Sequence, residues 1–219
     1  MTKSDAKNVM MLHETQHGVK GMAGCLDCMH IQWENCPYSL RRKHVGKDGI
    51  PTLVLEASCN YKLFFWHDEF GHAGALNDLN IWDRSQSHKS FIDGTFGKID
   101  FDFEIDGEQF TNLYFLVDGI YPELSRFVKT ISVLVSFYES KFAKWQESVR
   151  KNIKRGFGEL SKKFKFMQTP VRLHYVDNIF YVVKLCICLH NAMVVHCIEN
   201  GEDPETEDMY NITTNTENS

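Results

Sequence analysis

Apolar residues in the first third of the chain follow the pattern of β-strands. Small and apolar residues run through 20–31, and two further β-rich runs follow at 52–59 and 61–70, separated by Asn60 alone. Short apolar runs divided by turn residues are typical of strands in one sheet. We therefore expect three consecutive strands, of which the last two form a tight antiparallel hairpin.

The second half of the chain changes to helical spacing. Apolar residues recur at three- and four-residue steps from 142 to 164, and 177–198 is apolar almost throughout. A stripe of this period predicts a helix that packs on a sheet by one face, whereas the second helix should be buried. Inside it, His190 and Asn191 are expected to be hydrogen-bonded core residues rather than ligands. Strands followed by packed helices indicate an α/β domain.

Shorter elements lie between these segments. Residues 5–17 have weak helical patterning, and Asn77 or Asp78 is a suitable N-cap for a helix that follows. Residues 91–111 predict an exposed hairpin. Its alternating acids could mimic a metal cluster, but the interleaved apolar residues favour a solvated strand face; the acids are Asp100, Asp102, Glu104 and Asp106.

Length and charge indicate one domain with an acidic end. The 219 residues, 43% of them hydrophobic, suffice for one core. Residues 1–20 are then a short lead-in, 21–198 the domain, and 199–219 a polar tail without periodicity, expected to be disordered. Seven acids and no Lys or Arg follow residue 198, so the net charge of −5 belongs to the tail and the body is close to +2.

The composition argues against membrane and secreted proteins. We find no apolar run of the roughly 18 residues that a membrane span needs, and no signal peptide at the start. Seven scattered cysteines indicate reduced thiols in the nucleus or cytoplasm. Cys25 and Cys28 form a CxxC pair, but no second pair follows at zinc spacing.

Two aspartates are expected at the tips of apolar strands. Small and apolar residues run up to Asp27 and continue through 28–31, and Asp118 follows the apolar run 112–117. Each could simply cap a turn. Alternatively, neighbouring strands would bring them to a shared divalent cation, since hard cations require several oxygen ligands.

A basic segment lies within the first long helix. It contains one acid, Glu159, and seven cations: Arg150, Lys151, Lys154, Arg155, Lys162, Lys163 and Lys165. Such a segment is either a solvated helix face or a surface that contacts nucleic-acid phosphates. For the second interpretation the candidate residues are Arg150, Lys151, Arg155, Lys162 and Lys163.

Several motifs together resemble the PIF/Harbinger transposases of the DDE superfamily and the host proteins derived from them. The resemblance runs from about Gly21 to Val195 in the family's motif order. It rests on GCLDCMHIQWENCP, GKDGIPTLVLEA, WHDEFGHAGALNDLNIWDRS, FLVDGIYPELSRFVKTIS, KFAKWQESVRKNIKRGFGELSKKF and CICLHNAMV. It implies an RNase H-like fold, in which helices flank a mixed sheet whose first three strands are antiparallel.

The resemblance also implies a metal-dependent nuclease acting on DNA. In the family, two aspartates and a glutamate hold two Mg²⁺ or Mn²⁺ ions for phosphodiester hydrolysis and strand transfer. By position the aspartates correspond to Asp27 and Asp118, and Asp78 also lies in a family motif. The glutamate position is occupied by Lys154. An ammonium group there would repel a metal ion, and Glu159, about 140° further around the helix, cannot replace the missing acid.

Two main functions follow from this resemblance. One is a nuclease impaired by Lys154, and the other is a non-catalytic module of the same fold that binds DNA or a chromatin protein. A degenerate transposon fragment without a role is a third. Family members also carry a longer N-terminal region with helix-turn-helix-like character, so here a separate protein is a candidate for DNA recognition. The resemblance favours the nucleus over the cytoplasm and leaves the oligomeric state open.

Overall fold

A five-stranded mixed sheet forms the centre of the computed structural model, which describes residues 3–202 except 97, 132 and 134. The strand order is β3-β2-β1-β6-β7, in which β1 to β3 are antiparallel and β6 and β7 run parallel to β1. The strands are β1 (Met22–Gln32), β2 (Thr52–Cys59), β3 (Phe65–Ala73), β6 (Tyr114–Leu116) and β7 (Phe127–Val128). Together with the flanking helices, this is the predicted RNase H-like arrangement.

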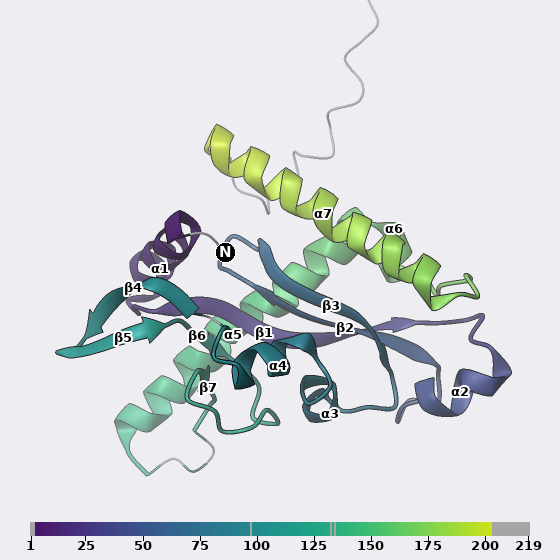
Figure 1. The fold of residues 1–219 in the computed structure, drawn as a ribbon, viewed down its shortest axis with the longest axis horizontal. Coiled ribbons are helices and arrows are strands. Elements are labelled where there is room, and N and C mark those ends of the chain that lie inside the picture. Colours follow the sequence, from purple (N-terminus) through teal and green to yellow (C-terminus); the bar gives the residue numbers. More distant parts are fainter. Residues whose placement is uncertain (1–2, 97, 132, 134, 203–219) are drawn as a thin grey trace, which may run out of the picture.

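Helices cover both faces of the sheet (Figure 1). The long helix α5 and the C-terminal helix α7 share one core with β1, β2 and β3, while α3 lies against a second core on the opposite face. The helices are α1 (Lys3–His17), α2 (Tyr38–His44), α3 (Asp78–Trp82), α4 (Gln86–Ile92), α5 (Phe137–Lys163), α6 (Lys165–Gln168) and α7 (Val176–Asn200).

Alternation along β1 assigns its side chains to the two faces. The Cys25 thiol donates to the Val149 carbonyl of α5 at 3.3 Å, whereas Leu26 belongs to the core on the opposite face. Asp27 accordingly faces α5, and Cys28 faces the side of α3, where its sulfur lies 3.5 Å from the Tyr121 hydroxyl. Because Cys25 and Cys28 point to opposite faces, they cannot share a zinc ion.

The helix predicted from the apolar stripe is α5. It begins with a capping box in which the Ser136 side chain accepts from the Glu139 backbone and the Glu139 side chain accepts from Ser136. Gly156 lies against the sheet, since a Cβ there would be 3.2 Å from both the Cys59 sulfur and the Phe65 ring. This close approach aligns the helix with β1 and β2.

The hairpin between β2 and β3 has a longer turn than the sequence predicted. β3 begins at Phe65 rather than at residue 61, because Leu63 adopts a φ of 63° and the Asn60 side chain accepts from the Phe64 N–H at 3.1 Å. A single asparagine could not have reversed the chain. The turn therefore shifts the alignment of the two strands relative to a one-residue connection.

Two smaller predictions are confirmed. The segment after residue 91 includes a two-stranded hairpin of β4 (Lys98–Ile105) and β5 (Glu108–Asn112), in which Phe103 is buried while Asp102 and Glu104 are exposed. Asn77 caps α3, with its side chain accepting from the Asn80 N–H at 2.8 Å. The side chain of Asp100 lies outside the described residues.

The C-terminal helix differs from expectation on one side. Its inner face is buried and includes His190, which contacts the Leu63 carbonyl at 2.9 Å, and Asn191, which bonds both backbone groups of Phe65. Its outer face exposes apolar side chains, among them Leu185 and Leu189. The prediction of a fully buried helix was wrong, because only one face meets β3 and α5.

Helix α7 also corrects the statement that no segment reaches spanning length. Within the described residues it is the one helix long and apolar enough to cross a membrane by length and composition, and 33% of its most apolar window is buried. Core helices of soluble proteins meet the same criterion. The helix runs to Asn200 with Gly201 as its C-cap, and the predicted tail from 203 onward lies outside the described residues.

Candidate functional site

Asp27, in the middle of β1, and Asp118, just beyond the end of β6, meet on two adjacent parallel strands, so only Asp118 lies at the strand tip expected for both. Cys25 of β1 pairs with Leu116 of β6, and each aspartate lies two positions beyond this pair. One atom contacts both carboxylates: Nη1 of Arg150 is 3.5 Å from Asp27 Oδ2 and 3.6 Å from Asp118 Oδ2. The two acids expected to share a metal ion thus share a guanidinium group from α5.

Side chains next to Arg150 fix this part of α5 to the strands. The buried amide of Gln146 donates to the carbonyls of Val117 and Val128, at 3.1 Å each, and Val149 accepts from the Cys25 thiol. These bonds join α5 to β1, to β7 and to the end of β6. The Arg150 side chain is 16% exposed, so it is held in place rather than extended into solvent.

The two carboxylates lie in different surroundings. Asp27 is buried and accepts from the Cys28 N–H at 2.9 Å, while the side chain of Asp118 is 45% exposed and accepts from the Gly119 N–H at 2.6 Å. Burial raises the pKa of Asp27, against the Cys28 N–H and the charge of Arg150, which lower it. Burial therefore disfavours the ionised form of Asp27, while the Cys28 N–H and the Arg150 guanidinium group favour it.

Lys154 lies one helical turn beyond Arg150 and is exposed. Its charge contributes to lowering the pKa of Asp27, which places the ammonium group on the side of the two acids. Glu159 is instead 3.9 Å from Lys162 on the same helix. Two carboxylates face two cations where a two-metal site would need further oxygen ligands, so these residues do not fit such a site.

Asp78 is the first residue of α3, directly after the cap Asn77. Together with Cys28, His30 and Thr52 it lines a cavity of about 550 Å³. Burial raises the pKa of Asp78, and the charge of Asp118 raises it further. Asp78 thus adds negative charge near the two aspartates, from the α3 side of the sheet.

The predicted DNA-contacting residues separate into two groups. Arg150 is turned toward the acids, Arg155 donates to Asn152 at 2.8 Å and lies over the Tyr61 ring, and burial lowers the pKa of Lys163. Four exposed lysines of α5 are called the basic stripe here, of which Lys154 lies to one side of a row formed by the other three: Lys144, Lys151, Lys154 and Lys162. Of these, the sequence prediction named Lys151 and Lys162 as DNA-contacting residues; Lys144 lies before the densest run of charge.

The partnership of Arg150 with the acids was missed. The available signal was its spacing, because Arg150 precedes Lys154 by four residues and such residues lie on the same side of a helix. A cation one turn before the family's glutamate position should therefore point at the same acids. The number of charges along the segment does not show on which side of the helix each one lies, so this contact was not predicted.

Comparison with known families gives one match, which covers most of the chain. The model of the plant transposon protein family matches residues 1–202. Comparisons with curated proteins and with solved structures found no match. The match agrees with the motif resemblance at the level of a transposase-derived protein, while the PIF/Harbinger type remains a prediction. The chain belongs to the plant transposon protein family.

Proposed function

We propose that this transposase-derived domain binds DNA without cleaving it. The observation that supports the proposal best is the position of Arg150, whose guanidinium group lies between the two aspartates. A divalent ion bound there would have to displace a cation held by two carboxylates and then remain close to Lys154. Like charges at about 4 Å repel by roughly 4 kcal/mol at intermediate dielectric, so metal binding is strongly disfavoured.

The basic stripe is the proposed DNA-binding surface. Lys144, Lys151 and Lys162 lie on nearly the same side of α5, because their separations are close to whole turns at about 3.6 residues each. At about 1.5 Å per residue the stripe spans roughly 27 Å, a length over which a duplex presents several phosphates. Glu147 is the exposed acid within this span.

Binding of this kind should be largely independent of DNA sequence. Lysine offers a compact charge on a flexible stem rather than the paired donors that read base edges. Selection of a site would then fall to a separate DNA-binding partner, and a nuclear location follows from the proposed ligand. A chromatin protein with an acidic surface is the corresponding protein ligand.

The proposal is tested by the salt dependence of DNA binding. The slope of log K against log salt is about −0.9 for each phosphate neutralised. Reversal of Lys144 and Lys151 to glutamate should reduce its magnitude by about 1.8, whereas the same reversal at two exposed lysines away from α5, Lys47 and Lys98, should leave it unchanged. Fluorescence anisotropy with a short DNA duplex measures this slope for wild type and for both double variants. An equal slope in all proteins would remove the basic stripe from the binding surface.

An impaired nuclease is the second candidate. Asp27 and Asp118 still converge on neighbouring strands, as the metal-binding acids of a DDE enzyme must. For Mg²⁺ or Mn²⁺ to bind, Arg150 would have to leave the two carboxylates. Cleavage by the unaltered protein distinguishes this candidate from the first.

A further inference from the structure

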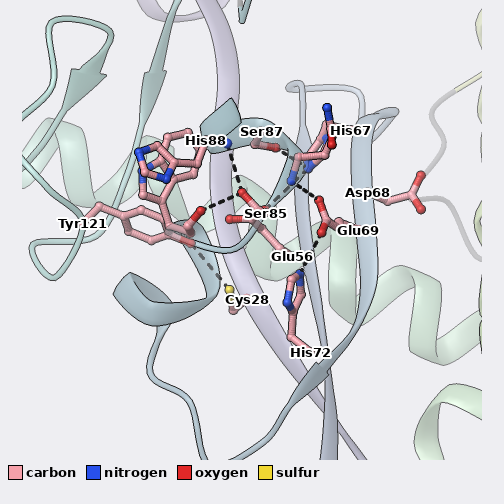
Figure 2. Close-up of polar contacts among 12 residues, drawn as sticks. Cys28, Glu56, His67, Asp68, Glu69, His72, Ser85, Ser87, His88 and Tyr121 are labelled. Carbon is pink, nitrogen blue, oxygen red and sulfur yellow. Dashed lines mark hydrogen bonds and ion pairs between the residues drawn. The ribbon is translucent and has the colours of Figure 1, made fainter. Parts of the chain in front are cut away.

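A second cluster of potential ligands lies on the sheet face opposite α5. Glu56 of β2 pairs with Glu69 of β3, and His67 lies two positions before Glu69 on the same face. Their ligand atoms all lie within 4.8 Å of one another. Figure 2 shows the three side chains facing one another beside Ser87, while Asp68 points away from them.

Glu56 is the unusual member of this cluster. Its side chain is 0% exposed, and neither carboxylate oxygen has a hydrogen-bond partner among the residues that the structure describes. The nearest potential cation is His67, whose Nε2 is 3.6 Å from Glu56 Oε2. A buried carboxylate without hydrogen bonds is costly, and nearly all buried polar groups in proteins are satisfied. The side chain therefore requires a further partner.

The other two members are held in position by neighbouring groups. Glu69 Oε2 accepts from the Gln86 N–H at 2.6 Å, and His72 Nε2 lies 3.3 Å from Glu69 Oε1. The Ser87 hydroxyl is 2.7 Å from His67 Nε2. The contacts to Glu69 are of the kind that orient metal ligands in proteins, whereas the Ser87 hydroxyl occupies the ring nitrogen of His67 that faces Glu56. Here they come from β3 and from the start of α4, so the cluster joins the two elements.

We propose that Glu56, His67 and Glu69 bind one divalent transition-metal ion, with Zn²⁺ as the best fit. An imidazole and two carboxylates form a donor set that suits Zn²⁺ better than Mg²⁺, which prefers oxygen ligands alone. The ion would give the buried carboxylate its missing partner and link the β2–β3 hairpin to α4. The site uses none of the residues of the proposed DNA-binding surface, so either can fail alone.

Calorimetry with the chelator-treated full chain tests this site. Wild type should bind one equivalent of Zn²⁺ more tightly than Mg²⁺, and Glu56→Gln and His67→Gln should each weaken Zn²⁺ binding by about 10-fold or more. Asp68→Asn is the matched control, because Asp68 lies between the ligands in sequence but pairs with Lys184 on the other face. Ser87→Ala should bind Zn²⁺ at least as tightly as wild type, since the hydroxyl competes for His67 Nε2.

Because the chain has seven free cysteines, whose thiolates are alternative Zn²⁺ ligands, a second measurement must identify the ligands. Co²⁺ in place of Zn²⁺ should give a d–d spectrum without the charge-transfer band of a thiolate ligand, and this spectrum should be lost in His67→Gln. Metal-free Glu56→Gln should unfold at a temperature no lower than metal-free wild type, because the variant buries no charge. Failure of wild type to bind, a thiolate band, or unchanged affinity in both ligand variants would overturn the proposal. If Glu56→Gln does not fold, His67→Gln decides.

Discussion

The guanidinium group of Arg150 lies 3.5 Å from the carboxylate of Asp27, a residue 123 positions earlier in the chain. The same nitrogen contacts Asp118 at 3.6 Å, so a single side chain bridges both acids. Repulsion between two acids is the usual reason why such a pair binds a metal ion. In this protein α5 supplies the compensating charge instead.

Replacement of Arg150 by glutamine should therefore have two effects. Leaving the mostly buried Asp27 without this cation is expected to lower the free energy of unfolding by about 3 kcal/mol. It should also make the protein more stable in Mg²⁺, because two adjacent carboxylates are now free to bind a hard cation. Urea denaturation with and without Mg²⁺ measures both effects.

Arg150→Lys provides the control, since it keeps a positive charge and should show little response to Mg²⁺. The experiment uses Mg²⁺ rather than Mn²⁺, because the imidazole-containing cluster at Glu56 favours transition metals and would bind Mn²⁺ as well. If Mg²⁺ stabilises wild type and Arg150→Gln equally, Arg150 does not occupy the place of a metal ion.

Two glycines of α5 provide a matched pair for the packing of this helix. A Cβ at Gly156 would be only 3.2 Å from the Phe65 ring, whereas a Cβ at Gly158 meets nothing within 4 Å. Gly158→Ala should stabilise the protein by about 0.5–1 kcal/mol through helix propensity. Gly156→Ala should be less stable than Gly158→Ala by about 1 kcal/mol or more, because Phe65 is buried and packed against Phe157. Equal stabilities would show that α5 is not in close contact with the sheet at Gly156.

Acid should destabilise the protein partly through His190. Burial lowers the pKa of His190 to about 4, compared with 6.5 for the unperturbed side chain. Since the unfolded state binds the proton more readily, the contribution of His190 is fully present above pH 6.5 and is lost as the pH falls toward 4. His190→Gln can retain a bond to the Leu63 carbonyl without titrating. Its free energy of unfolding should fall less between pH 6.5 and pH 4.5 than that of wild type, and identical pH profiles would contradict this assignment.

Local sequence patterns predicted the strands and helices well because burial on one face imposes a visible period. The run before Asp27 and the stripe after residue 141 both gave the correct element, and their order gave the correct sheet. The hairpin turn was mispredicted because the left-handed conformation of Leu63 has no glycine to signal it. The outer face of α7 was mispredicted because composition does not show how many neighbours a helix has.

The polar sites depend on contacts that sequence spacing only partly reveals. Asp27 and Asp118 could be paired because each adjoins an apolar run, but the direction of Arg150 is set by the bonds of Gln146 and Cys25 to other elements. The cluster of Glu56, His67 and Glu69 depends on the register between β2 and β3. That register follows from the turn at 60–64, which the sequence pattern did not identify.

The most direct measurement of the central claim is Mg²⁺-dependent nicking of supercoiled plasmid by wild type, Asp27→Ala, Lys154→Glu and the double variant Arg150→Gln/Lys154→Glu. Because Arg150 and Lys154 place positive charge where metal ions would have to bind, wild type should nick the plasmid no faster than Asp27→Ala. Wild type should nevertheless bind the plasmid DNA at low salt. Cleavage by wild type that Asp27→Ala abolishes would contradict the account.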